Sequence, residues 1–156
     1  MARLVVVIGP TGVGKTAHAI TLAQQYGCPI VSADSRQIYR DLPIGTAAPT
    51  AQEQALVEHH MVGFLGLHDT YSAGQFARDC EKLLKQLFAQ HDTVVLVGGS
   101  MMYVDALCNG LDEMPSVPDS IRQSVREQYQ LWGMTWLQEQ VQQFDPQYWE
   151  EVDQQN

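Results

Sequence analysis

The amino-acid sequence predicts an α/β fold of the P-loop type, in which a parallel sheet forms the middle of three layers and helices cover both faces. Short aliphatic runs alternate with segments of helical spacing, which is the pattern of βαβ units. The first run, residues 4–8, leads into a glycine-rich turn and then into a helical segment. After Asp112 the composition becomes acidic and rich in glutamine, which predicts the start of an α-helical insertion subdomain.

The elements follow in order along the chain. Residues 4–8 are a continuous aliphatic run, which is typical of a buried parallel strand. A helix is expected over 16–26, with Gly27 as its C-cap. A second strand is expected over 29–33, followed by a less regular stretch. The remaining elements of this part are a short helix, an amphipathic helix, a third strand and another short helix, at 51–58, 72–90, 93–97 and 101–107.

Two domains are expected, an incomplete P-loop α/β core at 1–112 and the start of the helical insertion subdomain at 113–156. Pro115 and Pro118 indicate a linker between them. Residues 113–156 carry a net charge of −6 and residues 1–112 one of −3. Helices are expected over 120–131 and 135–144, with a last turn near Pro146.

The composition narrows the classes of function. Of the 156 residues, 45% are hydrophobic and 17% charged, so the chain can build a packed core. A net charge of −9 argues against a broad basic face for nucleic acid, although it leaves room for a local basic site. No apolar run reaches the roughly 20 residues of a membrane span, and no signal peptide is expected. Cys28, Cys80 and Cys108 have no metal-like spacing and indicate reduced thiols in a cytoplasmic protein.

A phosphate-binding motif, G-x-x-x-x-G-K-[ST], lies between the first strand and the first helix. In such a loop, backbone amides and the helix N-terminus surround an anion. Lys15 would reach the outer phosphates, and the Thr16 hydroxyl would bind Mg²⁺. The alternative is an ordinary glycine-rich turn. The predicted phosphate-binding residues are Gly9, Pro10, Thr11, Gly12, Val13, Gly14, Lys15 and Thr16.

The motif indicates a polyphosphate ligand without saying which one. Many P-loop ATPases hold Mg²⁺ through an acidic residue after a later strand. Here the strand at 93–97 ends in Gly98, Gly99 and Ser100. The absence of an acidic residue there disfavours motors, GTPases and ATPases, and leaves small-molecule kinases and transferases with a pyrophosphate leaving group.

Two further segments carry polar residues at the ends of predicted strands. Asp34 follows the second strand and should enter the same cleft as Lys15, as a general base or a metal ligand. The alternative is a helix N-cap or turn residue. Gly98 and Gly99 permit close backbone approach, and Ser100 could donate to a phosphate oxygen. The alternative for this segment is a glycine-rich turn capped by Ser100.

Several motifs occur together over residues 4–112, at 9–16, 32–39, 44–47 with Pro49, His59 and His60, 71–73 with Phe76, 97–103 and 109–111. In this order they resemble the tRNA dimethylallyltransferases, the isopentenyl-transferase family that modifies the adenine just 3′ of the anticodon. The family usually has Gly-Gly-Thr-Gly-Leu-Tyr where this chain has Gly-Gly-Ser-Met-Met-Tyr, so the helix packing there is expected to differ.

The resemblance implies transfer of a dimethylallyl group from its diphosphate to N6 of that adenine. Lys15, the loop amides and a Mg²⁺ on Thr16 would stabilise the departing pyrophosphate, and Asp34 would accept the N6 proton. Ser100 stands at the position of the family's threonine and would contact the substrate or the bridging oxygen. The implied tRNA contacts are Asp34, Ser35, Arg36, Gln37, Ser100 and Arg122.

Because its segment is acidic, Arg122 has an alternative role as a solvent-exposed partner in an ion pair. His59 and His60 are given no chemical role, and a structural role in a loop is expected. Family members are longer, so we expect a truncated chain with three strands of the central sheet and doubtful catalytic competence. The whole enzyme is expected to be a monomer that binds the tRNA anticodon loop and dimethylallyl diphosphate, and no membrane.

Three alternatives remain open. One is a P-loop small-molecule kinase, although such kinases often carry Asp-x-Asp where this chain has Asp34, Ser35 and Arg36. A second is an adenylate isopentenyl-transferase that acts on a free nucleotide, against which the insertion from Glu113 onward argues. A third is a module that binds a nucleotide or pyrophosphate without turnover.

Overall fold

The computed structural model describes residues 2–111 and 117–154. The chain divides into two compact units, Met1–Asp112 and Glu113–Asn156.

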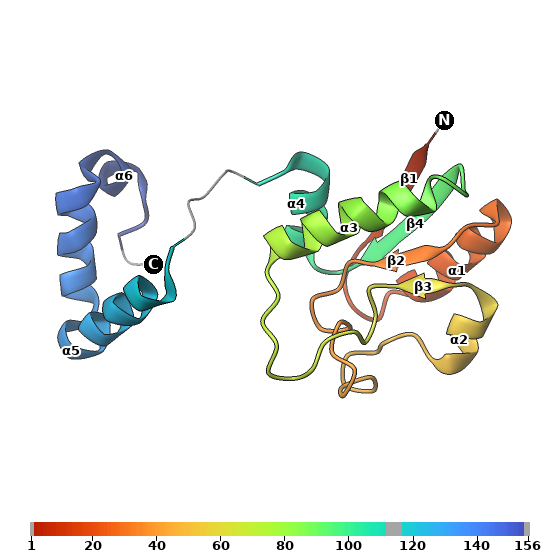
Figure 1. The fold of residues 1–156 in the computed structure, drawn as a ribbon, viewed down its shortest axis with the longest axis horizontal. Helices are drawn as coiled ribbons and strands as arrows, with labels where there is room; N and C mark the ends of the chain where they lie inside the picture. Colours follow the sequence, from red (N-terminus) through yellow and green to blue (C-terminus); the bar gives the residue numbers. More distant parts are fainter. Residues whose placement is uncertain (1, 112–116, 155–156) are drawn as a thin grey trace. The chain divides into compact units, whose positions relative to one another are not determined.

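The first unit contains a parallel sheet of four strands in the order β1-β4-β2-β3 (Figure 1). The strands are β1 (Arg3–Ile8), β2 (Ile30–Ser32), β3 (His59–His60) and β4 (Thr93–Gly98). The predicted parallel sheet is confirmed, but the expected number of three strands is wrong. The additional strand, β3, has only two residues and pairs with β2, so it leaves no aliphatic run in the sequence.

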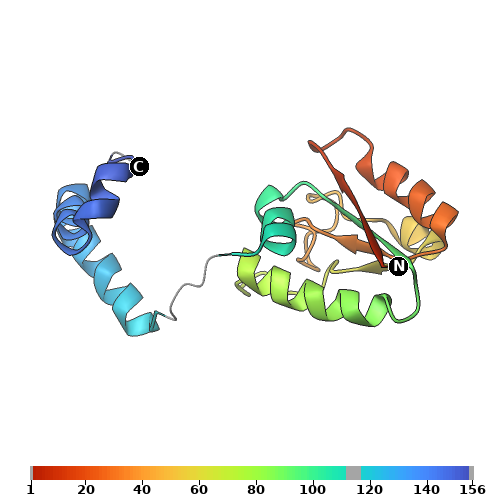
Figure 2. The same cartoon turned by 90° about the horizontal axis from the view of Figure 1, so that it is seen from above.

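Helices cover both faces of this sheet, which confirms the three-layer prediction (Figure 2). Side chains alternate between the faces of a strand. Ile30 and Val95 pack on one face with residues of α1 (Lys15–Tyr26). Val31 and Leu96 pack on the other face with residues of the two helices α3 (Ala73–Leu87) and α4 (Met101–Asn109).

The helix ends follow local sequence signals. Gly27 closes α1 in the left-handed conformation, as predicted. Thr50 and Ser72 begin α2 (Ala51–Leu56) and α3, each with a capping box. The helical spacing of apolar residues in α3 is confirmed because Phe76 and Cys80 are fully buried. All the predicted helices of this unit are present, with ends shifted by a few residues.

The prediction that the first strand is buried is wrong. In the described part of the chain, β1 pairs with β4 alone and lies at an edge of the sheet. The side chains of Val6 and Ile8 are 38% and 48% exposed. An aliphatic run therefore identified the parallel strand but not its place in the sheet.

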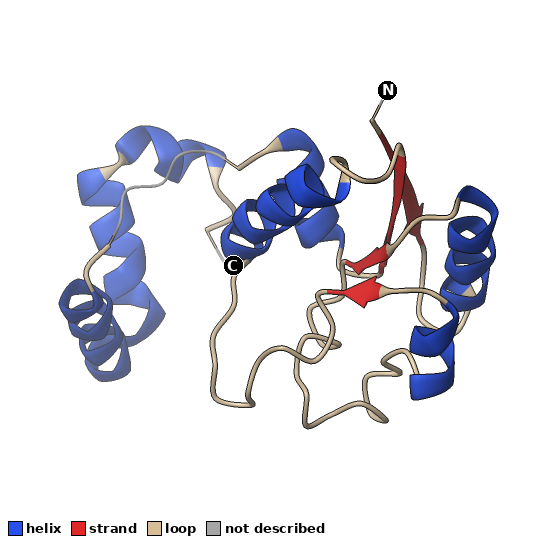
Figure 3. Cartoon of the chain, turned by 45° about the vertical axis from the view of Figure 1, so that its right-hand side comes forward, coloured by secondary structure: helices blue, strands red, loops and turns tan. Residues whose placement is uncertain are grey.

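The loops after β2 and β3 lie together beyond the carboxyl ends of the strands (Figure 3). The backbone N–H of Leu65 donates to the carbonyl of Ile38 at 2.9 Å, and the N–H of Gly63 donates to the carbonyl of Gln37 at 2.8 Å. In open parallel sheets this end is where ligands bind. The two loops thus lie at the same end of the sheet as residues 9–16, which we call the phosphate loop.

The second unit contains α5 (Asp119–Phe144) and α6 (Pro146–Glu151). Gly133 has φ 70° and ψ −162°, which divides α5 into two helical segments, as the sequence predicts. Asp145 begins α6 by accepting a hydrogen bond from the N–H of Tyr148 at 3.0 Å. Among the described residues of the chain, no helix is long and apolar enough to cross a membrane.

Candidate functional site

The phosphate loop is built from backbone groups. Gly12 and Gly14 have φ angles of 83° and 91°, which glycine adopts without strain. Gly14 is also the N-cap of α1 and provides no side chain to cap it. The first N–H groups of α1 are therefore left for an anion. Lys15 folds back over the loop, and its Nζ donates to the carbonyl of Pro10 at 2.6 Å.

Asp34 uses one carboxylate oxygen for a turn and keeps the other for the cleft. Its Oδ1 accepts the N–H groups of Arg36 at 2.9 Å and Gln37 at 3.4 Å. This is the turn role that the sequence offered as an alternative. Such a turn fixes the orientation of the carboxylate. Oδ2 faces a different neighbour, Gly99.

Gly99 marks the point at which the acid and the phosphate loop meet. A Cβ atom placed on Gly99 would lie 4.0 Å from Oδ2 of Asp34, 4.0 Å from Nζ of Lys15 and 3.7 Å from the carbonyl oxygen of Gly9. The space beside Gly99 is thus bordered by a carboxylate, an ammonium group and the loop backbone. The predicted approach of Asp34 to Lys15 is present in the structure.

Gly98 has a different reason to be glycine. A Cβ atom on Gly98 would lie 2.0 Å from the carbonyl oxygen of Ala33, so no side chain fits. The close backbone approach expected at the two glycines is therefore real at Gly98. It allows the end of β4 to pass directly beside the end of β2, which brings Asp34 next to the phosphate loop.

Ser100 joins the carboxyl ends of two strands. Its Oγ accepts the N–H of Ser35 at 2.8 Å and donates to Oγ of Ser35 at 2.9 Å. Ser100 stands at the N-cap position of α4, but its side chain makes no capping hydrogen bond. The alternative that Ser100 caps a turn through its hydroxyl is therefore wrong, because that hydroxyl is used by Ser35.

A cavity of about 340 Å³ extends from the phosphate loop along β2. Ile30, Ser32 and Asp34 line it from one face of β2 and its continuation. The wall opposite the phosphate loop, which we call the far wall, consists of residues lying after β2. The far wall is formed by Thr46, Ala47, Pro49, Glu53 and His59.

The cavity lining combines charged, polar and apolar side chains. Lys15, Thr16 and Asp34 contribute charged and hydroxyl groups. Small or aliphatic side chains provide one part of the remaining lining, namely Ala17, Ala19, Ile30, Ala47, Pro49 and Val97, and polar side chains provide another, namely Thr11, Ser32, Gln37, Thr46, Glu53 and His59. This combination suits a ligand with an anionic head and a short hydrocarbon chain.

Several predicted residues lie outside the described lining of this cavity. Ser35 and Ser100 are hydrogen-bonded to each other and are not among the described lining residues. The side chain of Arg36 is exposed. Arg122 belongs to the second unit, where its Nε donates to the carbonyl of Val117 at 3.4 Å. The first unit therefore brings together the phosphate loop, Asp34 and Gln37.

The sequence alone assigned no role in binding to the residues of the far wall. One signal was available, because Thr50 and Glu53 fit the capping-box pattern and place Glu53 in the first turn of α2. The amide and hydroxyl of Thr50 lower the pKa of the Glu53 carboxyl, with a smaller contribution from His59. Glu53 is therefore ionised at neutral pH. Ala47 gave no signal, because alanine has no turn preference of its own.

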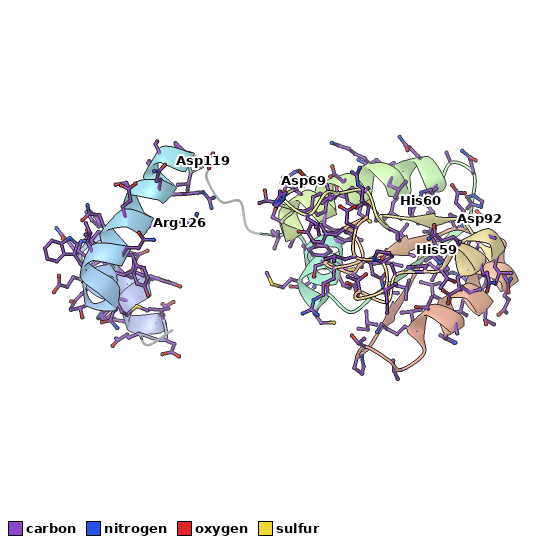
Figure 4. The ribbon with its side chains drawn as sticks, turned by 90° about the horizontal axis from the view of Figure 1, so that it is seen from below. His59, His60, Asp69, Asp92, Asp119 and Arg126 are labelled. Carbon is purple, nitrogen blue, oxygen red and sulfur yellow. The ribbon has the colours of Figure 1, made fainter. Side chains whose placement is uncertain are left out.

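His59 and His60 lie on β3, so the expectation that they belong to a loop is wrong (Figure 4). Nδ1 of His59 is 2.7 Å from the carbonyl of Val57. Because a carbonyl only accepts, Nδ1 carries the proton of that bond. Nε2 of His60 lies 3.3 Å from Oε1 of Glu58. Both imidazoles thus contact the segment that leads from α2 into β3.

The residues present fit a magnesium ion that binds together with a diphosphate. Within residues 2–111 and 117–154, no group of three or more His, Cys, Asp or Glu side chains could hold a metal by itself. Mg²⁺ commonly takes only one or two protein ligands beside phosphate oxygens. Thr16 lines the cavity next to Lys15 and could supply one such ligand.

The fold and the glycine-rich loop define an α/β protein of the P-loop class. A family model described as "IPP transferase" matches residues 37–156, so the chain belongs to the IPP transferase family. The family predicted from the sequence motifs is thus confirmed.

Curated relatives agree with this assignment. The chain is 48% identical over 156 residues to "tRNA dimethylallyltransferase 2" of Parabacteroides distasonis, covering 100% of this chain and 52% of that protein. It is also 48% identical over 156 residues to "tRNA dimethylallyltransferase 1" of Bacteroides thetaiotaomicron, covering 100% of this chain and 51% of that protein. The chain thus spans about half the length of the curated relatives it matches.

Solved structures share the fold. A full-length tRNA isopentenylpyrophosphate transferase from Bacillus halodurans matches with a TM-score of 0.70 and 27% identity, over 100% of this chain and 52% of that one. A eukaryotic dimethylallyltransferase acting on tRNA matches with a TM-score of 0.80 and 22% identity, over 99% of this chain and 38% of that one. At that identity the second likeness shows the fold alone.

Proposed function

We propose that the protein containing this chain transfers a dimethylallyl group from dimethylallyl diphosphate to N6 of the adenine 3′-adjacent to the anticodon in tRNA. One observation carries the proposal. Oδ2 of Asp34 and Nζ of Lys15 border the same space beside Gly99. A diphosphate leaving group and a nucleophilic amine must meet at such a point, between a cation and a base.

The phosphate loop would bind the diphosphate of the donor. Its amides and Lys15 would stabilise the negative charge that develops as the bond between the allyl carbon and the bridging oxygen breaks. When bound, Mg²⁺ would add positive charge at the same phosphate oxygens, with Thr16 as its protein ligand. The hydrocarbon chain would lie against the small and aliphatic residues of the lining, among them Ala17, Ile30 and Ala47.

Asp34 would act as the general base. Its Oδ1 is held by two backbone N–H groups, which leaves Oδ2 for the proton of the adenine N6 amine. The new C–N bond forms at N6, and the proton passes to Oδ2. Ser100 holds the backbone next to Asp34 through Ser35 and would also contact the substrate.

The tRNA would present its adenine from a single-stranded loop, because a stacked base cannot reach a cleft of this kind. Arg36 is exposed beside Asp34 and is proposed, with Ser35, to contact the flanking nucleotides. Arg122 is proposed as a contact from the second unit. We also propose that the whole protein is cytoplasmic and monomeric.

The test is a transfer assay on this chain extended to the length of its relatives. Two reactions contain labelled dimethylallyl diphosphate, one with tRNA and one with free AMP. A third contains ATP and small hydroxylated acceptors instead. We expect label in tRNA only, and loss of transfer in Lys15→Ala and Asp34→Ala. Transfer to AMP would instead favour an adenylate isopentenyl-transferase, and ADP release that depends on a small acceptor would favour a kinase. The comparisons with known proteins favour neither alternative.

A further inference from the structure

Gln37 spans the cavity from β2 to the far wall. Its Oε1 accepts the hydroxyl of Ser32 at 3.0 Å. Its Nε2 donates to the carbonyl oxygens of Ala47 at 3.0 Å and Thr46 at 3.5 Å. A glutamine amide has one acceptor oxygen and two N–H donors. The side chain thus uses both of its polar atoms inside the protein.

The backbone that Gln37 holds is strained. Ala47 has a φ of 51°, in the left-handed region. For a residue with a Cβ atom this conformation costs about 1–2 kcal/mol, and it persists only where neighbouring groups hold it. Thr46 and Ala47 both line the cavity. The strained position is therefore part of the far wall itself.

The other end of the bridge is fixed. Ser32 is only 2% exposed and lies on β2, two residues before Asp34. A buried hydroxyl without a partner costs free energy, so the Ser32–Gln37 hydrogen bond is stabilising. Gln37 consequently connects a rigid strand of the sheet to a strained loop.

We propose that Gln37 is a positioning residue, which holds Thr46 and Ala47 at the distance from the phosphate loop that suits the hydrocarbon part of the donor. This inference rests on the proposed function. A side chain engaged in this way would have to release the far wall before it could contact a nucleotide. The role therefore differs from the tRNA contact that the family resemblance implies for Gln37.

The first experiment compares two ligands on the 156-residue chain. Inorganic pyrophosphate probes the phosphate loop alone, and dimethylallyl diphosphate probes the loop together with the far wall. Both are titrated calorimetrically in the presence of Mg²⁺. In Gln37→Leu we expect the affinity for dimethylallyl diphosphate to fall about tenfold, the effect of losing one to two hydrogen bonds, while the affinity for pyrophosphate stays within about twofold.

A second substitution tests the strain. Glycine adopts a φ of 51° without cost, so Ala47→Gly removes the need for a side chain that holds the backbone. In the double variant Gln37→Leu with Ala47→Gly, the affinity for dimethylallyl diphosphate should return to within about threefold of the original chain. Ala47→Gly alone is the matched control and should change the affinity by less than Gln37→Leu does.

Three binding results would contradict the proposal: an unchanged affinity of Gln37→Leu for dimethylallyl diphosphate, an equal fall in its affinity for pyrophosphate, and no recovery in the double variant with Ala47→Gly. A kinetic result would also contradict it. In that case, Gln37→Leu in the extended protein raises only the KM for tRNA. The proposed function fails by a different result. In that case the unsubstituted chain binds dimethylallyl diphosphate no better than pyrophosphate, or the unsubstituted extended protein transfers no label.

Discussion

The two walls of the cavity are built in different ways. The phosphate loop is one continuous segment, residues 9–16, whose ligand-binding groups belong mostly to the backbone and to Lys15. The far wall is assembled from residues between 46 and 59 and is held by side chains of other segments. Gln37 donates a hydrogen bond to the carbonyl of Ala47, and Ser32 donates one to Gln37. Under the proposed function, the first wall would bind any diphosphate, whereas the second would select the rest of the ligand.

The largest expected contrast is between substitutions of the two adjacent glycines at the end of β4, because one should prevent folding and the other should weaken only ligand binding. Gly98→Ala would place a Cβ atom 2.0 Å from the carbonyl of Ala33, so we expect no folded core. Gly99→Ala would meet Asp34 and Lys15 at 4.0 Å, which is ordinary contact, so the chain should fold. Its methyl group occupies the space bordered by Asp34, Lys15 and the carbonyl of Gly9, and should weaken binding of dimethylallyl diphosphate about tenfold.

Circular dichroism and calorimetric titration of both glycine variants check this pair. A folded Gly98→Ala would show that β2 and β4 can separate, contrary to the structure. Normal binding by Gly99→Ala would show that the ligand does not use the space beside Gly99.

Lys15→Ala tests the phosphate-loop wall by itself. In the proposed site the ammonium group would make a charge-assisted contact with a phosphate oxygen, so we expect the affinity for pyrophosphate to fall about a hundredfold. Lys82→Ala is the matched control, because it removes the same charge from an exposed position on α3, where the side chain is 77% exposed. Equal affinities of the two variants would show that pyrophosphate binds elsewhere.

Thr50→Ala tests the far wall with the smallest expected effect. It removes the hydroxyl of the capping box on α2 and should lower the free energy of unfolding by about 1 kcal/mol, with little change in pyrophosphate affinity. Thr21→Ala is the matched control, since the Thr21 hydroxyl only bonds to Ala17 within α1. Urea denaturation measures both, and equal losses would argue against the cap.

The effect of Thr50→Ala should depend on pH. Hydrogen bonds from Thr50 lower the pKa of Glu53 from its ordinary value of 4.5. A carboxyl whose pKa is lower in the folded than in the unfolded protein contributes stability above the unfolded pKa, and this is lost as the pH falls through the folded pKa. The difference between Thr50→Ala and the original chain should therefore be full at neutral pH and shrink under acidic conditions.

The contrast between the walls also explains how far the sequence could be interpreted. The phosphate loop follows from a contiguous motif, and α1 and α3 follow from periodicity and caps. The bond between Ser100 and Ser35 joins residues 65 positions apart, and Gln37 and Ala47 are joined ten positions apart by a side chain. No local pattern encodes such pairs, or the left-handed conformation of Ala47. The edge position of β1 likewise depends on which strands pair.

The central claim is that Asp34 removes a proton in the cleft where the phosphate loop binds the donor. Asp34→Asn keeps the oxygen that accepts the turn hydrogen bonds, so the donor should still bind. In the extended protein we expect an affinity for dimethylallyl diphosphate within about twofold of the original and transfer to tRNA slower by a factor of about 10²–10⁴, the usual contribution of a general base. Transfer at nearly the original rate would contradict the claim.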